Sequence, residues 1–438
     1  MSVFKKSRHT VAIPLDTDME SMMAMYQTMT DAFILIPELA WSHLNNGSLA
    51  RVNSSTVDML SGNGILVKEG VNETALFKAW MQKHVHDFST IKSKVLVTRR
   101  CNNQCTYCIL DPKPMDMSRD TALAMDRFYL TIIKEKNPHK VQDDFLGGEP
   151  LLTPGIILES AARRYYYCLG RGIEYGFTIT TNGTLLQPSI IIKMKEAGLS
   201  GIRVSLAGPG PIHDCLRPSA GGGKTYDLII KNLKDTSGLI PVSIECQYDA
   251  SSQDYQKIPE MLDDFTKYDI LIENISFTPI LPRRGRSLFN AGMDDPEKFL
   301  YLKQEARKRG YPVDDEAPRN ACMADFRSRF IFDVDGHCLP CPSLGHSEMA
   351  YGHVNTGIDF VLESQLLQRE LPDQCLNKCE LLPICMGGCR LQALIKNDDF
   401  GGIDCHYDVY SVFLKDYILH KAQETLSRQG CECREKAA

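Results

Sequence analysis

The spacing of the cysteines constrains this chain more than any other feature of its sequence. Thirteen of the 16 cysteines fall in three groups, which are residues 101–108, residues 322–405 and the pair Cys431 and Cys433. The other three stand alone, within apolar patterns typical of core packing. In a reducing compartment such as the cytoplasm, cysteines do not form a disulfide scaffold. Crowded thiols in a protein of that compartment therefore indicate bound metal.

Composition excludes several classes of protein. The chain has 438 residues, 43% of them hydrophobic, which suits two or three folded domains and rules out wholesale disorder. The net charge of −6 is spread along the chain, so nothing favours a nucleic-acid partner. The first apolar run stops at Asp16, too short for a signal peptide, and no apolar stretch is long enough to span a bilayer. We expect a cytoplasmic protein with no membrane partner.

Residues 94–280 alternate apolar strands with amphipathic helices. The pattern predicts strands at 94–98, 143–147, 174–180, 201–206, 241–247 and 274–280. One helix follows Ser118, a suitable N-cap. Such alternation predicts an α/β fold in which a parallel sheet with right-handed crossovers forms a partial (β/α)6 barrel. Functional residues are expected at the C-terminal ends of the strands.

The predicted domains follow these changes of pattern. Residues 1–90 form a small α+β module, winged-helix-like, that would bind a leader peptide by strand addition. Residues 91–310 form the barrel, residues 311–425 a cysteine-rich domain, and residues 426–438 a tail. Cys431 and Cys433 are late ligands, a reactive pair or part of a disordered tail, and we favour the tail.

The first cysteine group contains three thiols, Cys101, Cys105 and Cys108, within eight residues. A structural zinc ion needs four ligands, and no fourth Cys or His lies nearby in sequence. A four-iron cluster held by three thiolates leaves one iron open for a substrate. A cluster therefore explains the missing ligand, and zinc with a distant fourth ligand is the alternative.

The spacing C-x3-C-x2-C, with Tyr107 before the last cysteine, resembles that of the radical S-adenosylmethionine (radical SAM) enzymes. The resemblance implies that the open iron chelates S-adenosylmethionine, which an electron cleaves to a 5′-deoxyadenosyl radical. The motifs "GGEP", "TTNGTLL" and "VSLAGPGPIHDCLRP" also follow strands, as in that family. The residues expected by this resemblance to bind S-adenosylmethionine are Tyr107, Gly147, Gly148, Glu149, Asn182, Ser205 and Arg217. His213 and Asp214 are expected to fix the loop rather than to catalyse.

The later cysteines resemble the SPASM domain, which carries two auxiliary four-iron clusters in peptide-modifying members of the family. By position, the first auxiliary cluster would be held by Cys322, Cys341 and Cys389, with Cys338 as candidate fourth ligand. The second auxiliary cluster would be held by Cys375, Cys379, Cys385 and Cys405. Three residues separate Cys375 from Cys379 where the usual number is two, so the ligand assignment stays open. A zinc domain is the alternative, because these spacings also suit zinc.

The resemblance implies an oxidoreductase with three [4Fe-4S] clusters that modifies a ribosomally made precursor peptide by a crosslink, epimerisation or excision. It further implies a reductant such as flavodoxin or ferredoxin, and a separate small peptide-recognition protein is a second possible partner. The alternatives are a sulfatase-maturing (formylglycine-generating) enzyme, a quinone-cofactor maturase, and a non-catalytic zinc or electron-transfer protein. No catalytic base is identified. In sulfatase-maturing relatives an aspartate follows the second SPASM cysteine, and here that position is Pro342.

Overall fold

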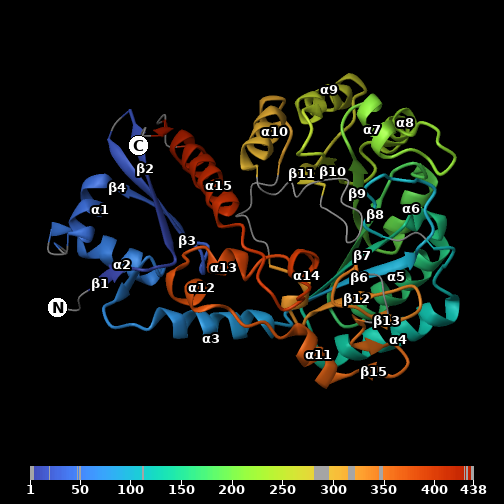
Figure 1. Cartoon of the computed structure of the whole chain (residues 1–438), viewed down its shortest axis with the longest axis horizontal. Coiled ribbons are helices and arrows are strands. Elements are labelled where there is room, and N and C mark those ends of the chain that lie inside the picture. Colours follow the sequence, from blue (N-terminus) through green and yellow to red (C-terminus); the bar gives the residue numbers. More distant parts are fainter. Residues whose placement is uncertain are drawn as a thin grey trace.

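A ten-stranded sheet organises the larger part of the molecule. The computed structural model describes residues 4–18, 20–46, 48, 51–110, 113–280, 295–313, 321–344, 349–428, 430 and 433–435. The strand order of this sheet is β11-β10-β9-β8-β7-β6-β12-β13-β14-β15. Figure 1 shows it on one side of the molecule, with a smaller sheet on the other side.

Six parallel strands form the centre of the large sheet. They are β6 (Thr90–Thr98), β7 (Lys140–Gly147), β8 (Glu174–Thr181), β9 (Leu199–Leu206), β10 (Val242–Tyr248) and β11 (Asn274–Pro279). Successive strands are neighbours, as right-handed crossovers require. All six strands predicted from the sequence are present, and the predicted α/β fold with a central parallel sheet is confirmed.

Helices connect and cover these strands. They are α4 (Arg119–Lys136), α5 (Pro154–Leu169), α6 (Pro188–Glu196), α7 (Gly210–Leu216), α8 (Tyr226–Thr236), α9 (Ile258–Lys267) and α10 (Pro296–Lys308), with the short helices η2 (Pro150–Leu152) and η3 (Asp254–Lys257). The predicted N-cap of α4 is confirmed, because Ser118 accepts a hydrogen bond from the Thr121 N–H. Met125 and Tyr129 on the inner face of α4 are fully buried in the core.

The cysteine-rich region continues the barrel sheet, which the sequence did not predict. Strand β12 (Arg329–Phe332) pairs in parallel with β6, and β13 (His337–Cys338), β14 (Gly352–His353) and β15 (Gly357–Ile358) follow antiparallel. The remaining elements of this region are η5 (Met323–Asp325), α11 (Phe360–Leu367), α12 (Asp373–Lys378), α13 (Leu382–Cys385), α14 (Arg390–Asn397) and α15 (Tyr407–Arg428). The region is therefore joined to the barrel by main-chain hydrogen bonds.

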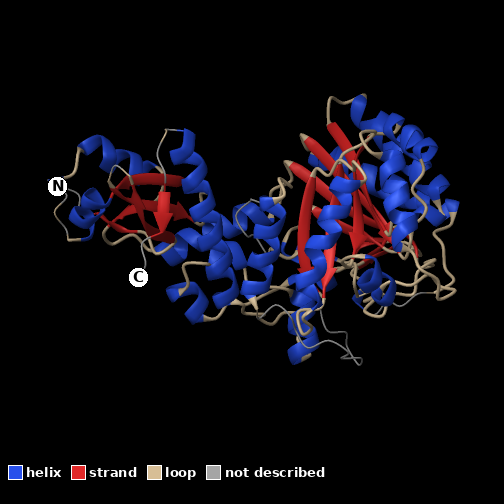
Figure 2. Ribbon diagram, turned by 90° about the horizontal axis from the view of Figure 1, so that it is seen from above, coloured by secondary structure: helices blue, strands red, loops and turns tan. Residues whose placement is uncertain are grey.

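The smaller sheet combines both ends of the chain. Its order is β16 (Cys433–Glu435), β2 (Thr10–Thr17), β3 (Ser21–Gln27) and β4 (Phe33–Pro37), all antiparallel. Around it lie β1 (Phe4–Lys6) paired with β5 (Leu66–Lys68), and the helices α1 (Glu38–Asn45), α2 (Ser54–Gly62) and α3 (Glu73–Val85). Figure 2 shows this sheet beside the barrel sheet.

Helix α15 supplies much of the core under the smaller sheet. Leu15 and Tyr26 of the sheet pack in one cluster with Leu414 and Ile418 of α15. The sequence predicted a tail at residues 426–438. The structure differs from this prediction, because α15 continues to Arg428 and Cys433 lies in a strand. No helix in the described part of the chain is both long and apolar enough to cross a membrane.

Candidate functional site

The first cysteine group lies in the loop after β6, at the C-terminal edge of the parallel sheet. The Gln104 N–H donates to the Pro218 carbonyl and the Thr106 N–H to the Leu216 carbonyl, so the loop is fixed against the segment after β9. Cys101, Cys105 and Cys108 are half-buried and interact electrostatically. Burial raises the pKa of the Cys101 thiol to about 11, and its two neighbouring thiols add to the rise.

Two glycines, the last residue of β7 and the residue after it, let neighbouring strand ends approach. The Gly148 N–H donates to the Thr98 carbonyl, and the Glu149 N–H donates to the Arg100 carbonyl. A Cβ at Gly147 would lie 2.2 Å from the Thr98 oxygen, and a Cβ at Gly148 would lie 2.2 Å from the Arg100 oxygen. Only glycine fits at such distances. The sequence assigned both glycines to S-adenosylmethionine binding, and the close approach in the structure is to the backbone that leads into Cys101.

Glu149 and Asn182 form a buried link between the ends of β7 and β8. The Glu149 carboxylate is fully buried and accepts hydrogen bonds from the Leu151 N–H, the Thr181 hydroxyl and the Asn182 N–H. Burial raises its pKa, against these hydrogen bonds. The Asn182 amide donates to Asn102 Oδ1 at 2.8 Å, beside Cys101. The expected contact of Glu149 with S-adenosylmethionine stays a prediction, because its oxygens already accept three hydrogen bonds within the protein.

Arg217 and Tyr107 lie together beside the thiols. Arg217 Nη1 donates to the Tyr107 hydroxyl at 2.7 Å and to Gln247 Oε1 at 2.9 Å. Burial alone would lower the pKa of Arg217, but its interactions with Tyr107 and Cys105 raise it. The sequence reasoning missed Gln247, although its position near the end of β10 was a signal that it belongs at this edge. Ser205 is buried on β9, one residue before that strand ends.

The loop-fixing roles expected of two further residues are confirmed. His213 is fully buried, and its Nδ1 accepts from the Ala207 N–H at 3.3 Å. Burial lowers the pKa of His213 to about 3, so this ring is neutral near pH 7. Asp214 accepts from the N–H groups of Thr225 and Tyr226 at the start of α8.

This edge of the sheet fits an iron–sulfur cluster with a bound amino acid group. Three thiols supply the donor set that such clusters use. Arg217 is 93% buried, and its Nε has no hydrogen-bond partner within the described residues, so it can receive an anionic group. A cavity of about 390 Å³ lies beside Cys101 and is lined also by Arg100, Asn102 and Leu152. Its volume is in the range of small-molecule sites.

The cysteine-rich region brings together two further sets of thiols. Cys341 interacts electrostatically with Cys322 and Cys389, and we call these three the first auxiliary set. Cys385 interacts with Cys375, Cys379 and Cys405, and we call these four the second auxiliary set. The second set has the four cysteines predicted from the sequence, and the first has three of its predicted cysteines without Cys338. Their role as cluster ligands stays a prediction.

Cys338 lies away from the first auxiliary set. It is fully buried on β13 and packs in the barrel core, whereas Cys322 and Cys341 belong to a separate apolar cluster. Burial raises the pKa of Cys338 to about 12, and the one charged neighbour that adds to the rise is Glu363. The structure therefore does not bring this residue to the three thiols it was expected to complete.

Two alternatives from the sequence concern a zinc site and an aspartate base. Among the described residues, no three Cys, His, Asp or Glu side chains gather closely enough to bind one metal ion, so the zinc sites and the auxiliary clusters both stay predictions. Pro342 supplies no carboxylate after Cys341. Asp404 is 98% buried, and its Oδ1 accepts from Lys396 at 2.8 Å and lies 3.0 Å from His406 Nε2.

Comparisons with known proteins agree with this geometry. A sequence model of the Radical SAM superfamily matches residues 95–248. The Fe-coproporphyrin III synthase of Methanosarcina barkeri is 26% identical over 268 residues, which are 59% of this chain and 59% of that protein. An uncharacterised protein of Methanocaldococcus jannaschii is 32% identical over 224 residues, which are 50% of this chain and 71% of that protein.

Two solved structures share the fold. Native anSMEcpe with bound AdoMet has a TM-score of 0.59 at 18% identity, over 77% of this chain and 99% of that one. Streptococcus suis SuiB bound to the precursor peptide SuiA has a TM-score of 0.55 at 17% identity, over 92% of this chain and 99% of that one.

Proposed function

The chain belongs to the radical SAM superfamily, and from this premise we propose that it is an iron–sulfur enzyme that modifies a ribosomally made precursor peptide. The observation that carries the proposal is the gathering of ten cysteines into three sets, one at the barrel edge and two in the cysteine-rich region. Family membership implies one [4Fe-4S] cluster and S-adenosylmethionine. The two auxiliary clusters and the peptide are the proposed part.

The proposed cofactor site uses groups at four strand ends. Cys101, Cys105 and Cys108 would hold the cluster, and Arg217 would bind the carboxylate of S-adenosylmethionine. Bound together, these cofactors supply a 5′-deoxyadenosyl radical that takes hydrogen from an unactivated C–H bond. The Tyr107 hydroxyl and Gln247 orient the Arg217 guanidinium, and the Glu149 link holds Asn182 beside the cluster loop.

Replacement of Arg217 by alanine is expected to weaken S-adenosylmethionine binding about ten- to a hundredfold, since one charge-assisted contact is worth about 1.5–3 kcal/mol. Iron content should stay nearly unchanged. Equilibrium dialysis of the anaerobically reconstituted protein measures the dissociation constant, and a colorimetric assay measures the iron content. Arg203→Gln is the matched control, because Arg203 is an exposed arginine on β9. An unchanged dissociation constant in the Arg217 variant would mean that Arg217 stabilises the loop and does not bind S-adenosylmethionine.

The coverage of the fold supports a peptide substrate. The likeness to SuiB extends over 92% of this chain, which also has the smaller sheet outside the barrel. In that sheet β4 is an edge strand, and an extended peptide would pair with its free main-chain groups. A small separate recognition protein is the alternative route for the peptide, and flavodoxin or ferredoxin would supply electrons.

A tetrapyrrole is the second candidate substrate. The 26% identity to the Fe-coproporphyrin III synthase favours it, but that match extends over only 59% of this chain. One experiment distinguishes the two candidate substrates. The reduced enzyme is incubated with S-adenosylmethionine and either a precursor peptide encoded near its gene or a coproporphyrin. We expect 5′-deoxyadenosine formation to be coupled to a mass change in the peptide. If only the porphyrin were converted, a tetrapyrrole would be the substrate and the peptide proposal would be wrong.

No formylglycine formation is expected on a sulfatase-motif peptide. Pro342 has no side-chain proton acceptor, and Asp404, which precedes Cys405, already pairs with Lys396. Mass spectrometry of a cysteine- or serine-type sulfatase peptide after incubation with reduced enzyme measures the aldehyde. Efficient conversion would favour a sulfatase-maturing enzyme, and Asp404→Asn would then show whether Asp404 is the base.

A further inference from the structure

One short loop connects the two auxiliary sets. This loop, Cys385–Cys389, begins with a cysteine of the second set and ends with a cysteine of the first. Its three middle residues, Met386, Gly387 and Gly388, have φ angles of 47°, 93° and 78°. A Cβ at Gly388 would lie 2.0 Å from the Asp404 carbonyl oxygen. The loop therefore has a tightly turned backbone that leaves little room to change the spacing of the two sets.

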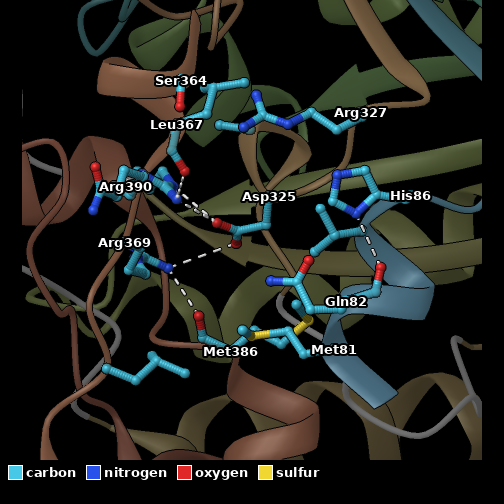
Figure 3. Close-up of a pocket in the computed structure, with 14 residues that line it drawn as sticks. Met81, Gln82, His86, Asp325, Arg327, Ser364, Leu367, Arg369, Met386 and Arg390 are labelled. Carbon is cyan, nitrogen blue, oxygen red and sulfur yellow. Dashed lines mark hydrogen bonds and ion pairs between the residues drawn. The ribbon is translucent and has the colours of Figure 1, made fainter. Parts of the chain in front are cut away.

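Arg369 fastens this loop from one side. Its Nη1 donates to the carbonyls of Met386 at 2.9 Å and Gly388 at 3.1 Å, and its Nη2 donates to the Gly402 carbonyl at 3.0 Å. The Arg369 side chain is only 5% exposed. Figure 3 shows it pointing toward Asp325 and Met386, at a cavity of about 220 Å³ between α3 and the cysteine-rich region.

The charge of Arg369 is only partly balanced. Its Nη1 lies 3.6 Å from Asp325 Oδ2, but Arg390 also binds that carboxylate, through Nε and Nη2 at 2.8 Å each. Two guanidinium groups thus share one buried carboxylate. Arg369 also interacts electrostatically with Cys322 of the first auxiliary set and Cys385 of the second. A net positive charge therefore lies between the two sets.

We propose that Arg369 is a positioning residue shared by both auxiliary sites, which fixes the loop between them and raises the reduction potential of each. This inference rests on the proposed function, in which each set holds a four-iron cluster. A cluster that accepts one electron becomes more negative. A buried cation nearby stabilises that reduced state, because charges interact more strongly in a low-dielectric interior than in water. Cluster potentials respond to local charge and hydrogen bonding.

The test is a redox titration with dithionite, followed by electron paramagnetic resonance. It uses the reconstituted full-length chain with alanine at the three cysteines of residues 101–108, so that only auxiliary clusters give signals. Arg369→Gln is expected to lower both midpoint potentials, with about a tenfold fall in the equilibrium constant for reduction, or about 59 mV for one electron. Arg369→Lys keeps the charge, so both midpoint potentials should stay close to those of the wild type.

Two further variants make the test two-sided. Asp325→Asn removes the opposing charge with little change of shape, and should raise the potential of the first auxiliary set. Arg327→Gln is the matched control, since Arg327 lines the same cavity but pairs with Glu363, and should leave both potentials unchanged.

Equal potentials in the wild type and Arg369→Gln, or equal shifts in the Gln and Lys variants, would overturn the role of Arg369. If Arg369→Gln loses iron, the sign of the Asp325→Asn shift decides, and no rise would contradict the proposal. A parent protein without auxiliary cluster signals would instead reject the proposed function.

Discussion

Replacing Cys101, Cys105 and Cys108 by alanine is expected to abolish formation of 5′-deoxyadenosine and to remove about a third of the bound iron. All three thiols belong to the loop after β6, and Cys101 lines the cavity beside Arg100 and Asn102. Without them no cluster remains at that edge to pass an electron to S-adenosylmethionine. Chromatography of the reduced reaction mixture measures the nucleoside, and a colorimetric assay measures iron.

The matched control is Cys215→Ser, which removes a lone exposed thiol on α7. It should keep both the iron content and the nucleoside yield of the wild type. A triple variant that still produces 5′-deoxyadenosine would contradict the assignment of this loop as the S-adenosylmethionine site.

Replacing Arg164 by methionine is expected to lower the stability of the barrel by about 3–5 kcal/mol, because it leaves the buried Asp143 without a counter-charge and Asp126 with only its ion pair to Arg163. Arg164 is fully buried, and its Nε and Nη1 each lie 2.9 Å from one carboxylate, Asp126 and Asp143 respectively. The guanidinium also lies over the Tyr129 ring, 4.7 Å from its centre. This cluster joins α4 and α5 to β7.

Unfolding of the barrel helices, followed by circular dichroism in denaturant, measures this loss. The control is Arg119→Gln, which breaks an exposed ion pair with Glu159. It should leave the denaturant concentration at the midpoint of unfolding unchanged. An unchanged transition in the Arg164 variant would mean that the two carboxylates are protonated or hydrated once the cation is gone.

The sequence predicted the elements whose signal is local. Six strands with helices between them leave a regular pattern, and the motifs at Cys101, Gly147 and Asn182 occur where those strands end. The capping serine before α4 was likewise visible, because its bond reaches only three residues along the chain.

The sequence did not predict pairings between distant segments. Strand β3 reads "SMMAMYQ", and five consecutive residues of it are buried, so it lacks the alternation that reveals a half-exposed strand. The pairing of β16 with β2 joins residues more than four hundred positions apart. Nothing local encodes such a contact. The same holds for β12, which joins β6 from the cysteine-rich region.

Cys338 illustrates how spacing misleads near a strand. It lies three residues before Cys341, which suggested a shared ligand set. The short strand β13 instead pairs Cys338 with Phe332 and Gly352 and buries its thiol in the barrel core. Gln247 and Arg369 were missed for another reason: their partners come from other elements, and neither residue belongs to a cysteine motif.

Metal analysis of the anaerobically reconstituted wild-type chain tests the central claim most directly, which is that three cysteine sets each hold a four-iron cluster. Iron, zinc and acid-labile sulfide are measured per chain, beside variants that lack the cysteines of one auxiliary set. We predict about twelve irons with matching sulfide in the wild type, and a loss of about four with each set removed. The account would be contradicted if the wild type bound only about four irons together with zinc, and if that zinc were lost when the cysteines of residues 322–405 are replaced.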